Sequence, residues 1–270
     1  MKAAWVVAVV VCVVLTSAAF AQSGMSVRSL GMGNTVTGQA NDAGAWFNNP
    51  AGLGALNLTA QEGKTWANDA AAGFADTGNE TMWGATWSGW QPAKGMGIGA
   101  GYFDGDHSKT YGAGFGMAIK NTPLSLGADV SVVDPSAGSS TTYFDLAALY
   151  QFAQPEKAPI RVGLVAVDIT GEDKTTFDFG VAWPAAPNWL VAVDVNDITD
   201  EYETTFDAGA EYVFGAQAEW AARIGETDDG ADNNLTLGVG YKFANNWRLD
   251  AAWIDGNTDD TLAVSAGFGF

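Results

Sequence analysis

Apolar and polar residues alternate along most of the chain after residue 55. The clearest run spans residues 233–243, where one parity is apolar or aromatic: Leu235, Leu237, Val239, Tyr241 and Phe243. The positions between them hold small or polar residues. Successive side chains of a β-strand point to opposite faces, so this pattern predicts a strand with one apolar face. The same alternation recurs over residues 175–183, 216–226 and 260–270.

About fourteen such segments follow one another down the chain. They lie near residues 56–66, 81–90, 95–104, 110–120, 123–133, 141–152, 159–168, 175–183, 188–197, 203–214, 216–226, 233–243, 246–255 and 260–270. A tilted strand needs roughly 9–11 residues to cross a bilayer, and most of these segments are long enough. We therefore predict an all-β fold, a transmembrane, antiparallel, up-and-down β-barrel of about 14 strands formed by residues 55–270.

The connections between these segments fall into two alternating classes. One class is acidic and lies around residues 69–80, 104–106, 134, 172–173, 197–203, 226–232 and 255–260. The other class is short and carries prolines, namely Pro92, Pro123, Pro155, Pro159, Pro184 and Pro187. Proline cannot donate to a strand ladder, so it belongs at strand ends and turns. This sorting is typical of a barrel with one rim outside the cell and one in the periplasm, and it predicts a bacterial outer-membrane location.

Aromatic residues gather beside both classes of connection. Trp90, Phe152, Trp183, Trp189, Phe214, Phe243 and Trp247 lie next to the short turns, and Trp66, Tyr102, Tyr111, Phe177 and Trp253 lie near the acidic connections. We expect these residues to form the two interfacial girdles of a membrane barrel. The alternative, the core of a soluble β-protein, is disfavoured because the opposite parity of each strand is polar and rich in glycine. The terminal Phe270 is similar to the C-terminal insertion signal of bacterial outer-membrane barrels.

Composition excludes several other classes of protein. Charged residues make up 16% of the chain, aromatic residues 12%, and 34 of the 270 residues are glycine. A typical soluble domain has about 25% charged residues and about 7% glycine, whereas disordered acidic chains are poor in aromatic residues. The net charge of −19 and the lack of a basic cluster exclude a nucleic-acid partner, because phosphates need lysine and arginine to bind them.

Residues 1–21 have the features of a secretory signal peptide. Lys2 gives a basic start, residues 3–15 are apolar, and Ala19 and Ala21 form a small-x-small cleavage site. We predict cleavage after Ala21, with an uncleaved membrane anchor as the alternative. The sole cysteine, Cys12, lies inside this segment. A lipoprotein site has a small residue before its cysteine, whereas Val11 precedes Cys12, so we do not expect a lipid anchor. The predicted mature chain therefore has neither disulfides nor thiol chemistry, and it contains no apolar run of about 18 residues that could span a membrane as a helix.

Residues 22–54 precede the predicted barrel and show no strand periodicity. They contain Leu-Gly-Met-Gly at residues 30–33, Asn-Asp at 41–42 and Trp-Phe-Asn-Asn-Pro-Ala-Gly-Leu at 46–53. These motifs resemble the N-terminal signature of the FadL-type outer-membrane transporter superfamily, which includes the PorV/PorQ-like proteins. The resemblance implies a hatch inside the lumen of the barrel, with these motif residues: Gly31, Met32, Gly33, Asn48, Asn49, Pro50, Ala51, Gly52 and Leu53. We expect Asn-Pro-Ala-Gly to form a turn in which Gly52 is free to adopt a positive φ.

The hatch and the lumen wall together suggest a binding site. Trp46 and Phe47 could plug the lumen or contact an acyl chain. The alternation of side chains places six glycines of two neighbouring strands on the face that points into the lumen: Gly97, Gly99, Gly101, Gly112, Gly114 and Gly116. Such a smooth wall lets a ligand or another backbone come close, so we expect a hydrophobic ligand between it and the two aromatic residues. The alternatives are that the aromatic residues only pack the plug and that the glycines only relieve crowding.

Charged residues also have the inward parity. They are Asp129, Asp145, Asp178, Asp194, Asp207, Glu211, Glu219 and Asp250 together with Arg161, Arg223, Lys242 and Arg248. We expect them to pair with each other or with the hatch, because an unpaired buried charge is costly. The only histidine, His107, lies in an acidic connection, and no nucleophile motif occurs, so we predict neither an enzyme nor a cofactor. Residues 255–259 begin like a calcium loop but lack its glycine and closing glutamate, so no metal is expected.

These features predict a barrel that passes small hydrophobic molecules, fatty-acid-like in character, by passive diffusion across the outer membrane. The predicted partners are outer-membrane lipid, lipopolysaccharide at the acidic rim, and the hydrophobic molecules themselves. One alternative is a non-transporting structural or secretion-accessory barrel with a protein partner in the secretion machinery and a permanent plug. Another is an open porin that favours cations, which a hatch of about thirty residues would occlude.

Overall fold

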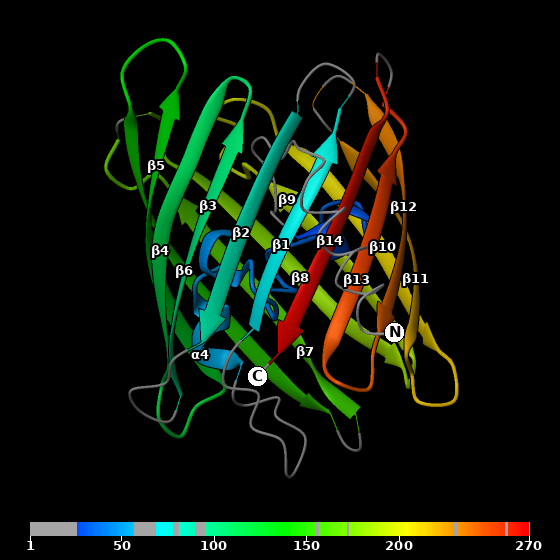
Figure 1. Cartoon of the computed structure of the whole chain (residues 1–270). Coiled ribbons are helices and arrows are strands. Elements are labelled where there is room, and N and C mark those ends of the chain that lie inside the picture. The colour runs from blue at the N-terminus through cyan, green and yellow to red at the C-terminus, as the bar shows by residue number, and fades with distance from the viewer. Residues whose placement is uncertain are drawn as a thin grey trace.

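The computed structural model describes residues 26–56, 69–77, 81–89, 95–154, 157–171, 173–228, 230, 232–256 and 259–269. Fourteen strands form a closed barrel in which every strand pairs with its neighbours in the chain and β1 closes on β14 (Figure 1). All pairings are antiparallel. The predicted all-β, antiparallel barrel of fourteen strands is confirmed.

The strands are 8 to 14 residues long. They are β1 (Asp69–Asp76), β2 (Thr81–Gly89), β3 (Met96–Gly105), β4 (Ser108–Ala118), β5 (Leu124–Pro135), β6 (Thr141–Gln154), β7 (Lys157–Val167), β8 (Thr176–Ala186), β9 (Trp189–Asn196), β10 (Thr205–Phe214), β11 (Trp220–Asp228), β12 (Asn233–Lys242), β13 (Trp247–Ile254) and β14 (Thr261–Gly269). The connections that follow odd-numbered strands meet at one end of the barrel, which we call the acidic rim (Figure 1, top). Those that follow even-numbered strands meet at the other end, the short-turn rim.

The first strand differs from the prediction. It was expected near residues 56–66, but Leu56 lies at the end of a helical turn, the rest of that range lies outside the described residues, and β1 begins at Asp69. Alanine and glycine occupy both faces of β1, so its sequence shows no alternation of apolar and polar side chains. Pairing with β2 and β14 places Asp69 at the short-turn rim, opposite Ser88, and not in an acidic loop as predicted.

The connection between β10 and β11 is longer than expected. The alternation predicted a strand from residue 216, but residues 215–219 form a turn in which Gly215 has a φ of 100° and Ala218 a φ of 54°. Glu219 was predicted to point into the lumen. It lines the lumen cavity described below, and its carboxylate also accepts a hydrogen bond from the Gln217 amide within this turn, at 2.8 Å.

The outward face of the barrel is apolar. Side chains such as Leu126, Leu146 and Val239 are exposed there, as expected of a surface that meets lipid. Near the short-turn rim a chain of ring contacts runs through Trp189, Tyr212, Phe214, Trp220, Tyr241 and Phe243, with ring centroids 4.5–6.5 Å apart. These contacts include Trp189, Phe214 and Phe243 of the girdle predicted at that rim; Trp90 of that girdle and Trp66 of the other lie outside the described residues. In the part of the chain that is described, no helix is long and apolar enough to cross a membrane.

Residues 26–56 pack inside the barrel (Figure 1, blue). They contain three short helices, α2 (Val27–Leu30), α3 (Ala45–Asn48) and α4 (Ala51–Ala55). Met32, Trp46 and Leu53 are at most 1% exposed. A large part of the buried apolar core therefore belongs to this segment, which we call the N-terminal segment. Gly52 does not adopt the predicted positive φ, because Asn-Pro-Ala-Gly starts α4 instead of forming a free turn.

Candidate functional site

Inward-facing glycines of β3 and β4 lie directly against the N-terminal segment. A Cβ atom built on Gly101 would lie 2.7 Å from Cζ2 of Trp46, and one built on Gly114 would lie 2.7 Å from the Trp46 carbonyl oxygen. Gly99 and Gly112 also contact Trp46, whereas Gly97 and Gly116 face Leu53 and the start of α4. All six glycines therefore have the predicted inward parity, and the N-terminal segment occupies the wall that they form.

The row of glycines continues around the barrel beyond the six that the sequence pattern singled out. Each further member abuts the backbone of the N-terminal segment: Gly127 on β5 meets residues 50–51, Gly163 on β7 and Gly180 on β8 meet Thr37, Gly209 on β10 and Gly225 on β11 meet Met32, and Gly238 on β12 meets Gly31. These positions were missed because all except Gly238, which shares β12 with Gly240, occur alone on their strands. Their common inward parity was the available signal.

Trp46 is fully buried, and its indole makes a hydrogen bond and two ring contacts. Its Nε1 donates a hydrogen bond to Thr86 Oγ1 at 2.6 Å, and Thr86 Oγ1 donates to the Ala43 carbonyl at 2.6 Å. The ring meets Phe47 edge-on at 5.4 Å between centroids and stacks on Phe103 at 6.5 Å. Phe47 is half-buried. Because Trp46 fills the space between the glycines, a ligand can reach that wall only if the segment moves.

An apolar cluster surrounds Trp46 on the side of the acidic rim. Met82 lies at the start of β2, Phe103 near the end of β3 and Ile254 at the end of β13, and all three pack in one cluster with Trp46 and Phe47. The register of β2 and β3 places these residues towards the connections that follow β1 and β3. The lumen is therefore apolar towards the acidic rim on this side of the barrel.

The remaining motif residues fix the path of the segment. Asn49 is fully buried, donates through Nδ2 to the Thr37 carbonyl at 2.7 Å, and accepts from the Ala51 amide at 3.1 Å. Gly33 has a φ of 65°, and its amide donates to Thr236 Oγ1 at 2.8 Å. Pro50 caps α4, and the Asn48 side chain lies beside Gly44. The motif thus joins separate parts of the segment to one another and to the barrel wall.

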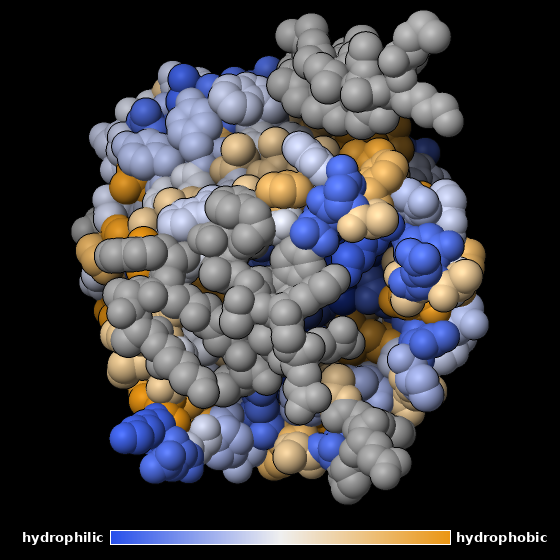
Figure 2. All heavy atoms as spheres, turned by 60° about the horizontal axis from the view of Figure 1, so that its bottom comes forward, coloured by the Kyte–Doolittle hydropathy of each residue, from blue (hydrophilic) through white to orange (hydrophobic). Residues whose placement is uncertain are grey.

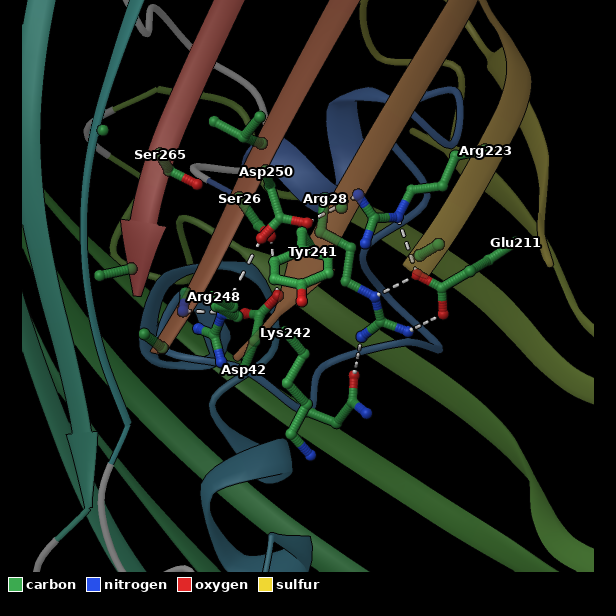
Figure 3. A pocket seen from close by; sticks show the side chains of 18 of the residues that line it. Ser26, Arg28, Asp42, Glu211, Arg223, Tyr241, Lys242, Arg248, Asp250 and Ser265 are labelled. Atoms are coloured by element: carbon green, nitrogen blue, oxygen red, sulfur yellow. Dashed lines mark hydrogen bonds and ion pairs between the residues drawn. The ribbon is translucent and has the colours of Figure 1, made fainter. Parts of the chain in front are cut away.

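Arg28 joins the N-terminal segment to β10, and two further arginines, Arg223 on β11 and Arg248 on β13, extend this ion-pair network along the barrel wall (Figure 3). Arg28 binds Glu211 with two hydrogen bonds, Nε to Oε2 at 2.9 Å and Nη2 to Oε1 at 2.7 Å. Arg223 Nε donates to the same carboxylate at 2.8 Å. Arg223 Nη1 also lies 2.7 Å from Asp250 Oδ1, an ion pair that lacks hydrogen-bond geometry. Arg248 Nη2 donates to Asp69 at 2.7 Å.

This network lines a cavity of about 370 Å³. The opposite wall of the cavity carries small residues and one aromatic residue, namely Ala71, Gly73, Gly84 and Phe103. Seen from the short-turn rim, hydrophilic side chains gather in a recess inside the barrel (Figure 2). The lumen therefore changes from an apolar cluster near the acidic rim to a charged cavity nearer the short-turn rim.

Three of the inward carboxylates pair as predicted, and the others do not. Glu211 and Asp250 pair with arginines, and Asp194 accepts the amides of Val36 and Thr37 of the N-terminal segment, both at 2.7 Å. Asp145, Asp178 and Asp207 instead accept backbone amides at the acidic rim. Two members of the predicted set do not pair within the described residues, because no hydrogen bond or ion pair reaches Asp129 or Arg161.

Comparison with known proteins establishes the fold. No protein-family model and no curated protein matches the sequence. A TodX deletion mutant, described as a monoaromatic hydrocarbon channel, matches with a TM-score of 0.64 at 12% identity, over 93% of this chain and 100% of that one. CymD, also a monoaromatic hydrocarbon channel, matches with a TM-score of 0.63 at 13% identity, over 93% and 99%. Omp33, an outer-membrane protein of Acinetobacter baumannii, matches with a TM-score of 0.56 at 11% identity, over 76% and 98%.

The fold is thus that of bacterial outer-membrane β-barrels. Two of these neighbours are described as channels for hydrophobic compounds, and none of the three is described as an enzyme. No group of three or more histidine, cysteine or acidic side chains that could hold a metal occurs in the described ranges, which omit residues 257–258 of the predicted calcium-like loop.

Proposed function

We propose that this barrel passes small hydrophobic molecules, fatty-acid-like or aromatic, across the bacterial outer membrane by passive diffusion. The observation that carries the proposal is the apolar cluster around Trp46, Phe47 and Phe103 at the acidic-rim side of an occupied lumen. The TodX and CymD channels, whose names specify monoaromatic hydrocarbons, share the fold over nearly the whole chain. In this proposal the N-terminal segment is a hatch that must move before a molecule can pass.

The proposed route follows the polarity of the lumen. A hydrophobic molecule would first contact Phe47, which is half-buried beside the cluster, and would then replace Trp46 against the glycine wall of β3 and β4. Burial of apolar surface contributes roughly 25 cal/mol per Å², which favours transfer from water to the cluster without an energy source. The charged cavity nearer the short-turn rim would favour release, because it offers little apolar surface on the side of the arginines.

Native mass spectrometry of protein extracted from outer membranes in mild detergent tests this proposal. We expect a bound apolar molecule, which the double variant Trp46→Ala, Phe47→Ala releases. Trp189→Ala is the matched control because Trp189 lies on the outward face of β9, and it should keep the molecule. An empty wild-type barrel, or a molecule retained equally by all three proteins, would contradict binding at this site.

A second candidate function is supported by the tight packing of the N-terminal segment. Its backbone abuts inward glycines on eight strands, and Trp46 is fully buried, which is the packing expected of a permanent plug. Under this alternative the protein is a structural or secretion-accessory barrel of the PorV/PorQ-like kind. The same extraction discriminates between the two, because such a barrel would come out without an apolar molecule and with a protein partner.

We also propose that the chain is exported with residues 1–21 removed, that residues 22–54 act as one hatch unit, and that the acidic rim meets lipopolysaccharide. Acidic residues cluster in the connections that follow β7 and β9, including Asp173, Asp200 and Glu201. Divalent cations could bridge such carboxylates to lipid phosphates. The mass of the extracted chain tests the cleavage site directly.

A further inference from the structure

Among the described residues, Arg161 is the only one of the four arginines that lacks an acidic partner. Arg28, Arg223 and Arg248 each bind a carboxylate of the lumen. Arg161 points inward from β7, is 8% exposed, and forms no hydrogen bond or ion pair with any described residue. A buried cation without an acidic partner is strongly unfavourable. Within the described residues its guanidinium is therefore free to bind an acceptor that enters the lumen.

Gln151 lies directly beside this arginine. It is the cross-strand partner of Arg161 in the pairing of β6 with β7. Gln151 is 8% exposed, and its Nε2 donates to no described residue. Because cross-strand partners have Cβ atoms about 5 Å apart, a single acceptor between the two side chains could bind both.

The N-terminal segment brings a second carboxamide to the same place. Thr37 lies against Gly163 of β7, and a Cβ atom built on Gly38 would lie 2.8 Å from the amide nitrogen of Ala182 on β8. Ala182 is the cross-strand partner of Arg161, so we infer that the next residue of the segment, Gln39, lies close to that arginine. Gln39 is 2% exposed, and neither its Nε2 nor its Oε1 has a hydrogen-bond partner among the described residues.

The groups around this place offer N–H donors to an anion. The carboxylates that attract Arg161 are Asp42 and Glu211, and Glu211 is already bound by Arg28 and Arg223. Arg28 is close enough to repel Arg161. One guanidinium and two carboxamides thus present N–H donors, and carboxamide and guanidinium donors bind small anions.

We propose that Arg161, Gln151 and Gln39 form a binding site for a small monovalent anion, of the size of chloride or formate, between the N-terminal segment and β6–β7. The anion neutralises Arg161 and connects residues 37–39 to the barrel wall, so it stabilises the segment inside the lumen. The site does not depend on transport, because the same contacts are needed whether the segment moves or is a permanent plug.

Bromide locates the site directly. Crystals of the wild-type protein grown with bromide as the only halide should show an anomalous peak within hydrogen-bonding distance of the Arg161 guanidinium. This measurement needs no variant, so it remains decisive even if changes at Arg161 prevent folding. No bromide at Arg161, or a carboxylate of the chain found there instead, would overturn the proposal.

Chloride dependence tests the site in solution. When chloride replaces gluconate at constant ionic strength, we expect the thermal midpoint of the detergent-solubilised protein to rise by about 3 °C and then saturate. Arg161→Gln should abolish this response, and Gln39→Leu should weaken it. Lys109→Gln is the control, since Lys109 forms only an exposed ion pair with Asp104 at 3.5 Å, and it should respond like the wild type. A bromide peak without any chloride response would mean an adventitious ion only.

Discussion

At the scale of single residues, glycine decides how closely the N-terminal segment approaches the wall. Pro50 and Ala51 lie against Gly127 on β5, and Met32 lies against Gly209 on β10 and Gly225 on β11. Backbone atoms occupy the space that a Cβ would need, so no side-chain rotation can relieve the contact. Parity along β3 and β4 predicted six of these glycines, but what they face depends on the path of a segment that has no periodicity.

We predict that Gly127→Ala destabilises the protein by about 1–3 kcal/mol, the usual cost of adding a methyl group to a packed interior. The added methyl group forces residues 50–51 away from β5. The free energy of unfolding by urea in lipid vesicles measures this effect. Ala128→Val is the control, because Ala128 is the next residue of β5 and has the outward parity. Equal effects of the two substitutions would show that the segment does not pack on Gly127.

At the scale of elements, two connections at the acidic rim repeat the same structure. Residues 168–170 and 197–199 both read Asp-Ile-Thr, and Thr-Thr-Phe-Asp follows each of them at residues 175–178 and 204–207. In each connection the first aspartate has a positive φ, 50° at Asp168 and 48° at Asp197. Its carboxylate accepts hydrogen bonds from the threonine two residues later and from the amide five residues later, at 2.6–2.9 Å.

These hydrogen bonds shift the acid–base behaviour of both aspartates. Burial raises the pKa of Asp168, but donors from Thr170, Asp173 and Gly171 outweigh it and lower that pKa below the ordinary value. Likewise burial raises the pKa of Asp197, and donors from Tyr202, Thr199 and Glu201 together with Lys174 lower it. A lowered pKa in the folded state means that the ionised carboxylate stabilises the connection above a pH of about 4, the ordinary pKa of aspartate.

We predict that Asp197→Asn lowers the free energy of unfolding at pH 7 and that the difference from wild type shrinks as the pH falls below about 4. The stabilisation is lost there because the wild-type carboxylate becomes protonated as well. Urea titrations from pH 7 to pH 3 measure the difference. Asp200→Asn is the control, because Asp200 lies in the same connection and its carboxylate accepts no hydrogen bond from a described residue. A difference that grows on acidification would contradict this account.

The sequence pattern predicted the positions of all strands except β1. Thirteen strands were predicted near their observed positions, because a surface between lipid and lumen imposes alternation on each of them. The exception is β1, where Ala70, Ala71 and Ala72 are small on both faces. Its position follows from barrel closure between β2 and β14, a long-range condition that local alternation does not contain. The repeated connections carried a usable signal in their Asp-Ile-Thr and Thr-Thr-Phe-Asp motifs, but hydrophobic periodicity does not detect it.

At the scale of the whole molecule, the barrel encloses a segment whose contacts change along the lumen. Towards the acidic rim the segment packs through Trp46 and Phe47 in an apolar cluster, and towards the short-turn rim Arg28 binds the charged wall. The sequence predicted that inward charges would pair, as Glu211 and Asp250 do. The folded path of residues 26–56 decides which ion-pair partner each charged residue has, and it leaves Arg161 without one among the described residues. The strand pattern alone does not contain this information.

Movement of the N-terminal segment is the central claim, and a reversible lock tests it most directly. A Cβ atom on Gly31 would lie 3.6 Å from the Cβ of Ala252 on β13, which is within the range for a disulfide. The same Cβ would lie 2.8 Å from the Cα of Gly238, so the single variant Gly31→Cys serves as the control for this crowding. The predicted mature chain has no other cysteine.

The measurement is the initial uptake of radiolabelled toluene by cells that express either the wild type or the double variant Gly31→Cys, Ala252→Cys. We predict that the wild type speeds uptake over cells without the protein, that the oxidised double variant does not, and that reduction restores uptake to the level of Gly31→Cys alone. Equal uptake by the oxidised and reduced forms would contradict movement of the segment, and wild-type uptake equal to that of cells without the protein would contradict hydrophobic transport.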